Sequence, residues 1–272
     1  MPRFTTSDGL SLYYTDEGGG LPILCLAGLT RTGRDFDYLA PYLGNHRLIR
    51  LDYRGRGQSD WDPNHLNYSL PIECRDVIEL LDHLSLNAVA IIGTSRGGLN
   101  AMGLAATAPD RLLGVALNDI GPELDPQGLN AIMAYLGRKP AAATFEDAAA
   151  ALAHVQVGFA NVPKSRWLEE AKLHFTIENN GLNITYDPKL RDAVEAGGDI
   201  PDLWPFFDAL AGKPLCTLRG GASNLLSPQT FHKMQVRRPD MICATVAGRG
   251  HIPFLDEPEA VSALNKWLEK LT

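Results

Sequence analysis

The sequence is poor in the features that mark secreted, membrane-spanning and nucleic-acid-binding proteins. Its four cysteines lie far apart with no C-x-x-C or metal-ligand spacing, which favours buried thiols in a reducing cytoplasm over disulfides or a metal site. No apolar run approaches the roughly 20 residues of a membrane-spanning helix, and residues 1–9 lack the apolar core of a signal peptide. Acidic side chains outnumber basic ones by 32 to 25, and the net charge of −7 argues against a nucleic-acid partner. We therefore expect a cytoplasmic protein with neither a nucleic-acid nor a membrane partner.

Length and composition are those of an ordinary globular protein. A chain of 272 residues is expected to form one domain, or at most two, and can bury a large core. The hydrophobic content of 45% and the charged content of 21% are typical of such proteins. The function must therefore be sought in local patterns.

Buried-strand and amphipathic-helix patterns alternate through the first 120 residues and return after residue 206. The expected strands cover residues 10–15, 22–26, 47–51, 88–92, 112–117, 213–218 and 241–246. The expected helices follow residue 33, cover residues 70–84 and 228–236, follow Ser95 and close the chain. This alternation predicts an α/β fold, a mostly parallel central sheet with helices on both faces. Binding sites in such sheets lie beyond the carboxyl ends of the strands.

The segment between these two parts has a different character. Residues 121–206 contain alanine-rich amphipathic segments and no convincing buried strand. We expect residues 1–120 and 207–272 to form the core, and residues 121–206 to form a helical cap over the edge of the sheet that holds the site. Such an insertion can serve as a lid or as a stabilising subdomain.

The strongest local signal is a serine between a strand and a helix. Gly93-x-Ser95-x-Gly97 joins an apolar strand to a helix-like segment. Glycine on both sides allows the sharp bend and the close approach of strand and helix that expose a serine hydroxyl. The N–H of Arg96 lies at the start of the helix, where a developing negative charge is favoured.

Four blocks, in this order, resemble the α/β-hydrolase fold of the esterase/lipase-like kind over the whole chain. They are Ala27-Gly28-Leu29, Asp52-x-Arg54-Gly55-x-Gly57-x-Ser59, Gly93-Thr94-Ser95-Arg96-Gly97-Gly98 and Gly250-His251-x-Pro253-x-Leu255-Asp256-Glu257-Pro258. The resemblance implies that Ser95 is the nucleophile and His251 the general base. It also implies an oxyanion hole formed by the N–H groups of Leu29 and Arg96, and a reaction that needs no metal or organic cofactor.

The acid that supports the histidine is ambiguous in the sequence. In the family it usually follows the strand before the last one, and Asn224 stands at that position. An asparagine cannot stabilise an imidazolium by charge. Asp119, 24 residues after Ser95, follows the next strand, and some family members carry the acid there. We favour Asp119 as the source of charge, with Asn224 helping to orient His251; Asp119 as a turn residue and Asn224 as a disabling replacement are the alternatives.

Three arginines lie close to these motifs. Arg31 and Arg34 follow the oxyanion strand, and Arg96 follows the nucleophile. Together they make a carboxylate-bearing substrate worth testing, although each side chain could instead pair with a nearby carboxylate.

These patterns favour a serine hydrolase that cleaves a small carboxylic ester or lactone through an acyl-enzyme on Ser95. Amide and C–C bond hydrolases use the same scaffold. A weakened hydrolase or a ligand-binding receptor is the alternative that Asn224 supports. The expected partner is a small-molecule substrate, and the sequence leaves the oligomeric state, a homodimer included, open.

Overall fold

The computed structural model describes residues 2–178 and 181–271 and contains one large sheet. The strands are β1 (Arg3–Thr5), β2 (Ser11–Glu17), β3 (Pro22–Leu26), β4 (Arg47–Leu51), β5 (Val89–Thr94), β6 (Leu112–Asn118), β7 (Phe175–Glu178), β8 (Gly181–Ile184), β9 (Leu215–Gly220) and β10 (Ile242–Val246). The α-helices are α1 (Leu70–His83), α2 (Arg96–Thr107), α3 (Pro126–Tyr135), α4 (Phe145–Val155), α5 (Lys164–His174), α6 (Leu190–Ala196), α7 (Trp204–Asp208), α8 (Pro228–Arg237) and α9 (Pro258–Leu268). Short 3₁₀ helices are η1 (Gly33–Phe36), η2 (Ala40–Tyr42), η3 (His65–Asn67) and η4 (Pro109–Arg111).

The large sheet has eight strands in the order β1-β2-β4-β3-β5-β6-β9-β10. Only the β1–β2 and β2–β4 pairs are antiparallel, and every pair from β4 to β10 is parallel. In the middle of the sheet Thr94 of β5 lies opposite Asn118 of β6. The residues that follow these two strands, Ser95 and Asp119, therefore leave the sheet side by side.

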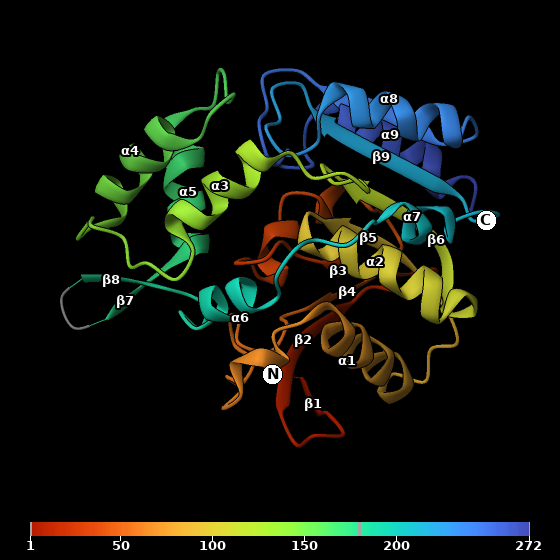
Figure 1. Ribbon diagram of the computed structural model, residues 1–272, viewed down its shortest axis with the longest axis horizontal. Helices are drawn as coiled ribbons and strands as arrows, with labels where there is room; N and C mark the ends of the chain where they lie inside the picture. Colours follow the sequence, from red (N-terminus) through yellow and green to blue (C-terminus); the bar gives the residue numbers. More distant parts are fainter. Residues whose placement is uncertain (1, 179–180, 272) are drawn as a thin grey trace.

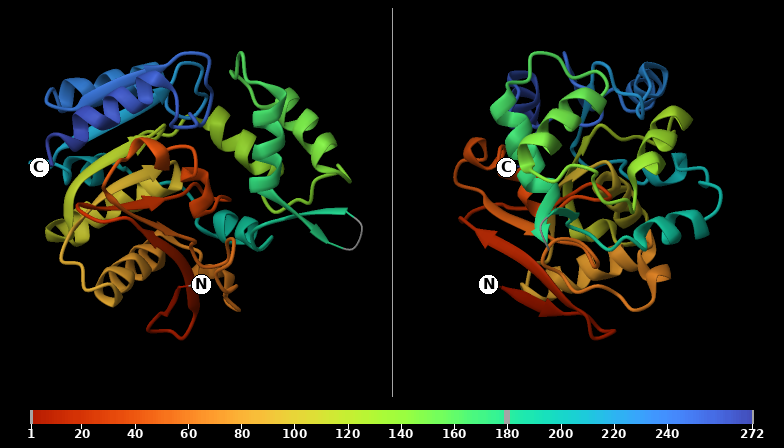
Figure 2. Two further views of the ribbon diagram at one scale, coloured as in Figure 1. Left: turned by 180° about the vertical axis from the view of Figure 1, so that it is seen from behind. Right: turned by 90° about the vertical axis from the view of Figure 1, so that its left-hand side faces the viewer.

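Two hydrophobic layers enclose the sheet, as the sequence pattern predicts. On one face α1, α2, α7 and α8 pack over alternate residues of the strands, such as Leu24, Ile91 and Val115. On the other face α9 and the segment around η1 pack over the intervening residues, such as Cys25 and Ile92. The views of Figures 1 and 2 show this arrangement of helices about the sheet. The single helix expected after residue 33 is instead a pair of short 3₁₀ helices.

The segment between β6 and α7, coloured green to teal in Figure 1, lies to one side of the sheet. It contains α3 to α6, which fits a helical insertion, but also the antiparallel pair β7–β8. The sequence predicts no buried strand in this segment, and the two strands of this pair are exposed (β7) or half-buried (β8). The sequence pattern does not reveal this pair, because each strand is only four residues long and β7 is largely exposed. The expected boundary at residues 206/207 falls inside α7, which packs on α2 of the core.

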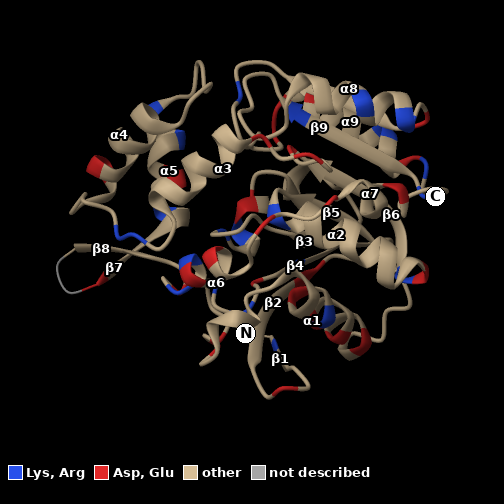
Figure 3. Cartoon of the chain, viewed as in Figure 1, with Lys and Arg blue, Asp and Glu red and all other residues tan. Residues whose placement is uncertain are grey.

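Charged residues of both signs occur in the core and in the inserted segment, as Figure 3 shows. No helix in the described part of the chain is long and apolar enough to cross a membrane.

Candidate active site

Ser95 lies on a tight turn between β5 and α2, with φ of 50° and ψ of −112°. A non-glycine residue adopts such a φ only where its surroundings enforce it. The neighbouring glycines show how: a Cβ atom on Gly93 would lie 2.6 Å from the carbonyl oxygen of Gly97, and one on Gly97 would lie 1.9 Å from that of Leu26. Strand and helix therefore meet backbone to backbone, and the turn predicted from the sequence is present.

His251 joins Ser95 to a buried carboxylate. Its Nε2 atom lies 3.0 Å from Ser95 Oγ, and its Nδ1 atom lies 2.7 Å from Asp119 Oδ2. The carboxylate can only accept, so Nδ1 carries the proton and Nε2 is left to accept the serine proton. The Asp119 side chain is fully buried, and the Ser95 residue is 9% exposed. A serine in this arrangement can lose its proton as it attacks a carbonyl group.

Asp119, at the end of β6, is held by the loop that follows β9. Its Oδ1 atom accepts a hydrogen bond of 2.7 Å from the N–H of Gly220, and its Oδ2 atom accepts one of 2.6 Å from the hydroxyl of Ser223. This loop therefore supplies donors to the acid instead of the acid itself. Ser223 was not recognised in the sequence, because a serine in a glycine-rich loop resembles an ordinary turn residue.

Asn224, the other candidate for the acid, does not join this chain. Within the described residues no hydrogen bond connects its side chain to His251, and its carbonyl group lies against Gly128 of α3. The expectation that Asn224 helps to orient His251 is therefore not met, because Asp119 already occupies the Nδ1 atom.

The two expected backbone donors flank the serine. Gly28 lies so near that a Cβ atom on it would be 3.9 Å from Ser95 Cβ, which brings the next residue, Leu29, to the site. Arg96 is the first residue of α2, where N–H groups have no partner within the helix. Within the described part of the chain, neither the N–H of Leu29 nor that of Arg96 donates to another backbone group. Both N–H groups can therefore donate to a negatively charged oxygen.

The Arg96 side chain turns away from the substrate side. Its Nε atom donates a 2.8 Å hydrogen bond to Glu73 of α1, which is fully buried. Glu73 also accepts from Arg56 at 2.8 Å. Burial raises the pKa of Glu73, but the two guanidinium groups outweigh it and lower the pKa below its ordinary value. Arg96 is therefore not a binding residue for an anionic substrate.

A small cleft of about 20 Å³ lies between the core and the inserted segment, next to the turn that carries Ser95 and the loop that carries His251. Thr94 and Ile252, the immediate neighbours of these two residues, line it. The other lining residues are Arg31, Asp35, Tyr38, Asn118, Leu152, Gln156, Phe159, Trp167, Glu170, His174, Pro253, Phe254 and Leu255. The cleft thus has an aromatic part and a charged part.

The charged part contains one arginine between two carboxylates. Arg31 Nη1 lies 3.2 Å from Asp35 Oδ2 and 3.3 Å from Glu170 Oε2, and His174 Nε2 lies 3.4 Å from the same Glu170 oxygen. Burial opposes ionisation of Glu170, but His174 and Arg31 lower its pKa to about 2. Burial raises the pKa of Asp35. Arg34 points to solvent and pairs with Asp37 at 3.5 Å.

Of the three arginines expected near the substrate, only Arg31 lines the cleft. Asp35, Glu170 and His174 were missed in the sequence, since none belongs to a motif and two come from α5 of the inserted segment. Within residues 2–178 and 181–271, no cluster of three or more His, Cys, Asp or Glu side chains could hold a metal ion.

Known proteins match this chain over nearly its whole length. A sequence model described as the Alpha/beta hydrolase family matches residues 23–264. The 3-hydroxybutyrate-oligomer hydrolase of Cupriavidus necator is 34% identical over 253 residues, covering 88% of this chain and 85% of that protein. An esterase of Mycobacterium tuberculosis is 27% identical over 258 residues, covering 90% and 81%. The crystal structure of an alpha/beta hydrolase from Novosphingobium aromaticivorans superposes with a TM-score of 0.93 at 39% identity, covering 99% and 97%.

Proposed function

The chain belongs to the alpha/beta hydrolase family and is a hydrolase, and we propose that it cleaves small carboxylic esters, lactones included, through an acyl-enzyme on Ser95. The observation that carries this proposal is the continuous chain from Ser95 Oγ through His251 to the buried carboxylate of Asp119, with distances of 3.0 and 2.7 Å. A hydroxyl group joined to a base and an acid in this way is the nucleophile of serine hydrolases.

Acylation follows from this geometry. His251 Nε2 takes the proton of Ser95 Oγ while the oxygen attacks the ester carbonyl carbon. The N–H groups of Leu29 and Arg96 donate to the oxyanion of the tetrahedral intermediate, and Asp119 stabilises the imidazolium. The C–O bond of the ester then breaks, and His251 gives its proton to the departing alkoxide.

Deacylation repeats these steps with water. His251 removes a proton from the water molecule that attacks the acyl-enzyme. The same two N–H groups stabilise the second oxyanion, and the carboxylic acid leaves as Ser95 regains its proton.

The cleft favours an uncharged, hydroxyl-bearing substrate. Its one arginine, Arg31, is already paired with two carboxylates, so no positive charge is left over for a substrate carboxylate. Asp35 Oδ2 and His174 Nε2 lie at its wall, each in an ion pair with Arg31 or Glu170, and neither has a further hydrogen-bond partner within the described residues. A hydroxyl group can donate to the first atom or bond the second. The name of the relative from Cupriavidus necator, a 3-hydroxybutyrate-oligomer hydrolase, supports esters of short hydroxy acids as substrates.

Three nitrophenyl esters test this proposal: the butyrate, the 3-hydroxybutyrate and the hemisuccinate. We expect turnover by the parent and kcat/KM about tenfold higher for the 3-hydroxybutyrate than for the butyrate, as a hydrogen-bonding site rewards a matching hydroxyl group. The hemisuccinate should be the poorest substrate. Equal rates on all three would contradict the hydroxy-acid preference and leave the esterase proposal standing.

Ser95→Ala provides the control for the mechanism. A fluorophosphonate should label the parent once per chain and leave the variant unlabelled, and the variant should lose turnover by several orders of magnitude. Absence of both labelling and turnover in the parent would disprove the esterase proposal. Labelling without turnover would instead favour a receptor or weakened hydrolase, for which the sequence offered only Asn224.

A further inference from the structure

We propose that Glu73 and Arg56 are positioning residues that hold the two N–H donors of the oxyanion hole, those of Leu29 and Arg96, in place for the reaction. This inference rests on the proposed function. It concerns residues that belong to no recognised catalytic position and make no contact with the cleft described above.

Glu73 connects α1 to the start of α2. Its side chain is fully buried and accepts three hydrogen bonds, from Arg96 Nε at 2.8 Å, from Arg56 Nη2 at 2.8 Å and from Asn100 Nδ2 at 3.1 Å. Arg96 and Asn100 lie one turn apart on α2, so the carboxylate fixes the first turn of this helix. That turn carries one of the two proposed oxyanion donors.

Arg56 connects Glu73 to the other proposed donor, the N–H of Leu29. Its Nε atom donates to the carbonyl oxygen of Leu29 at 3.0 Å, and its Nη1 atom donates to that of Arg54 at 2.6 Å. The guanidinium group is fully buried and lies over the rings of Tyr53 and Tyr68, with centroid distances of 5.7 and 5.4 Å. A planar guanidinium group that donates hydrogen bonds in several directions is held in a single orientation. The backbone at Leu29 is therefore tied through Arg56 to Glu73.

One carboxylate thus connects the two halves of the oxyanion hole, which come from segments 67 positions apart in the sequence. Oxyanion donors are effective only when they are held in advance where the charge develops. A displacement of a fraction of an ångström reduces the rate while the N–H groups themselves remain.

Because this network is charged, one substitution can show whether Glu73 acts by positioning the N–H donors or by its electrostatic effect on the oxyanion. Two arginines surround one glutamate, so Glu73→Gln increases the positive charge beside the oxyanion. If charge alone mattered, this substitution would maintain or raise the rate. If position matters, the rate falls.

The experiment measures nitrophenyl ester hydrolysis by Glu73→Gln per active site, counted by fluorophosphonate titration. We expect kcat to fall about 10- to 100-fold, less than the roughly 10²- to 10³-fold that loss of a whole donor costs, with KM within about twofold of the parent. Affinity for a trifluoromethyl ketone, which forms a tetrahedral adduct on serine, should fall by the same factor as kcat.

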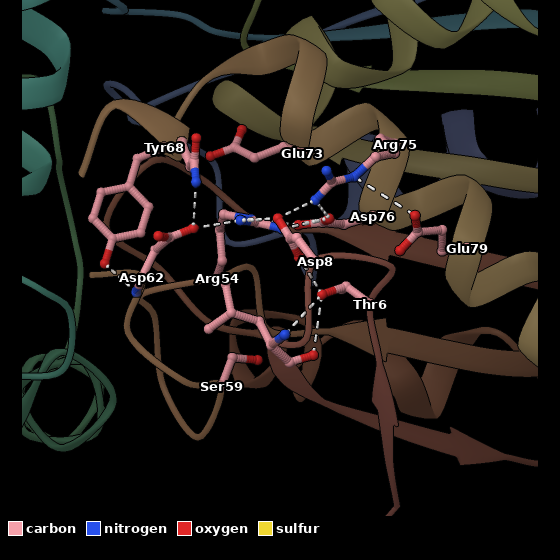
Figure 4. Close-up of polar contacts among 12 residues, drawn as sticks. Thr6, Asp8, Arg54, Ser59, Asp62, Tyr68, Glu73, Arg75, Asp76 and Glu79 are labelled. Carbon is pink, nitrogen blue, oxygen red and sulfur yellow. Dashed lines mark hydrogen bonds and ion pairs between the residues drawn. The ribbon is translucent and has the colours of Figure 1, made fainter. Parts of the chain in front are cut away.

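The matched control is Asp76→Asn, three residues further along α1. Asp76 is as buried as Glu73, with a side chain 1% exposed, and it also pairs with a fully buried arginine, Arg54, at 2.7 Å. Figure 4 shows this second network, in which Arg54 extends to Asp62 and Asp76. Both substitutions should destabilise the fold, but Asp76→Asn should leave kcat per active site unchanged.

Arg56→Lys is the second test and serves where Glu73→Gln does not fold. Lysine keeps the charge, but its ammonium group cannot bond Leu29, Arg54 and Glu73 as the guanidinium fork does, so the same loss of kcat is expected. An active parent with kcat unchanged or raised in Glu73→Gln, or unchanged in Arg56→Lys, would overturn the inference. A parent with neither turnover nor labelling would overturn the proposed function instead.

Discussion

Asp119 combines burial, a constrained backbone and three hydrogen-bond donors. Its φ of 55° is unusual for a residue other than glycine, and it turns the carboxylate toward His251 at the end of β6. The N–H of Gly220 and the hydroxyl of Ser223 both donate to this carboxylate. These contacts argue that Asp119, rather than Asn224, supplies the charge that the imidazolium needs.

Asp119→Asn should therefore lower kcat by about 10⁴-fold, the loss that the equivalent change causes in serine proteases. Asn224→Asp should change kcat by less than about threefold, because the new carboxylate would not meet the histidine. Steady-state hydrolysis of a nitrophenyl ester measures both. Rescue of the Asp119→Asn variant by Asn224→Asp would show instead that position 224 can serve as the acid.

Glu170 provides a prediction on pH and stability. Its folded pKa, about 2, lies below the ordinary glutamate value of 4.5, because His174 and Arg31 favour its ionised form. A lowered folded pKa stabilises the fold above the unfolded pKa, and this contribution is lost as pH falls toward 2. The shift corresponds to a contribution on the order of 3 kcal/mol at neutral pH.

We expect Glu170→Gln to be less stable than the parent at pH 5 and the difference to shrink as the pH is lowered to 3. Urea unfolding at both pH values measures it. Arg31, Asp35 and His174 face the carboxylate and remain in both proteins. A difference that stays constant between pH 5 and 3 would show that Glu170 acts through packing alone.

The residues of the site differ in how far the sequence could reveal them. Ser95 and His251 stand in local motifs, so their roles were foreseeable. The acid was not, because Asp119 and Asn224 both follow strands and only the hydrogen bond between His251 and Asp119 distinguishes them. Arg31 and Glu170 pair across 139 positions of sequence, and such a contact leaves no local pattern.

The turn between β5 and α2 depends on small residues at fixed positions. In Gly97→Ala the new Cβ atom would lie 1.9 Å from the carbonyl oxygen of Leu26, a backbone atom that cannot move aside without shifting β3. We expect a loss of at least about 3 kcal/mol in folding free energy, or a shifted Ser95, with activity reduced in either case. Gly103→Ala, in the same helix, is the control, since its Cβ atom meets only the Cys74 sulfur at 3.2 Å.

Urea unfolding and ester hydrolysis should therefore separate these two alanine variants. Gly103→Ala should stay within about 1 kcal/mol of the parent, because helix propensity favours alanine. Equal behaviour of both variants would mean that the close approach at Gly97 is not needed.

At the level of elements, buried strands were the most predictable part. The bounds of β3 and β4 match the expected residues 22–26 and 47–51. A short apolar run between turn residues is typical of a buried strand. The pair β7–β8 and the paired 3₁₀ helices were not predicted. Each is only three or four residues long, too short for a pattern to repeat, so contacts with distant segments determine its conformation.

Considered as a whole, the molecule joins its inserted segment to the core at several places, and α5 is the one that borders the cleft. Three residues on one side of this helix reach across: Arg166 to Asp256, Glu169 to Tyr38 and Glu170 to Arg31. The Arg166 guanidinium also lies 3.7 Å from the ring centroid of Tyr38, which lines the cleft. The position of α5 thus determines the shape of the space beside Ser95.

Arg166→Ala should loosen this connection. We expect KM for the ester to rise about three- to tenfold, because this factor corresponds to the free energy of one partly buried cation–π contact and ion pair. The value of kcat should stay within about twofold of the parent. Arg237→Ala is the control, since it removes a similar contact, over the Trp204 ring at 4.9 Å and to Asp208, outside the cleft. An unchanged KM in Arg166→Ala would show that α5 is held without this residue.

The placement of the acid on β6 has a consequence for how activity is lost. Ser95 and Asp119 leave adjacent strands, and the N–H of Ser95 donates to the carbonyl oxygen of Asn118 at 3.0 Å. Their separation is as rigid as the sheet itself. Of Ser95, Asp119 and His251, only His251 stands on a long connection, the one between β10 and α9. We therefore expect mild heating to abolish activity reversibly by displacing the His251 ring, before the sheet unfolds.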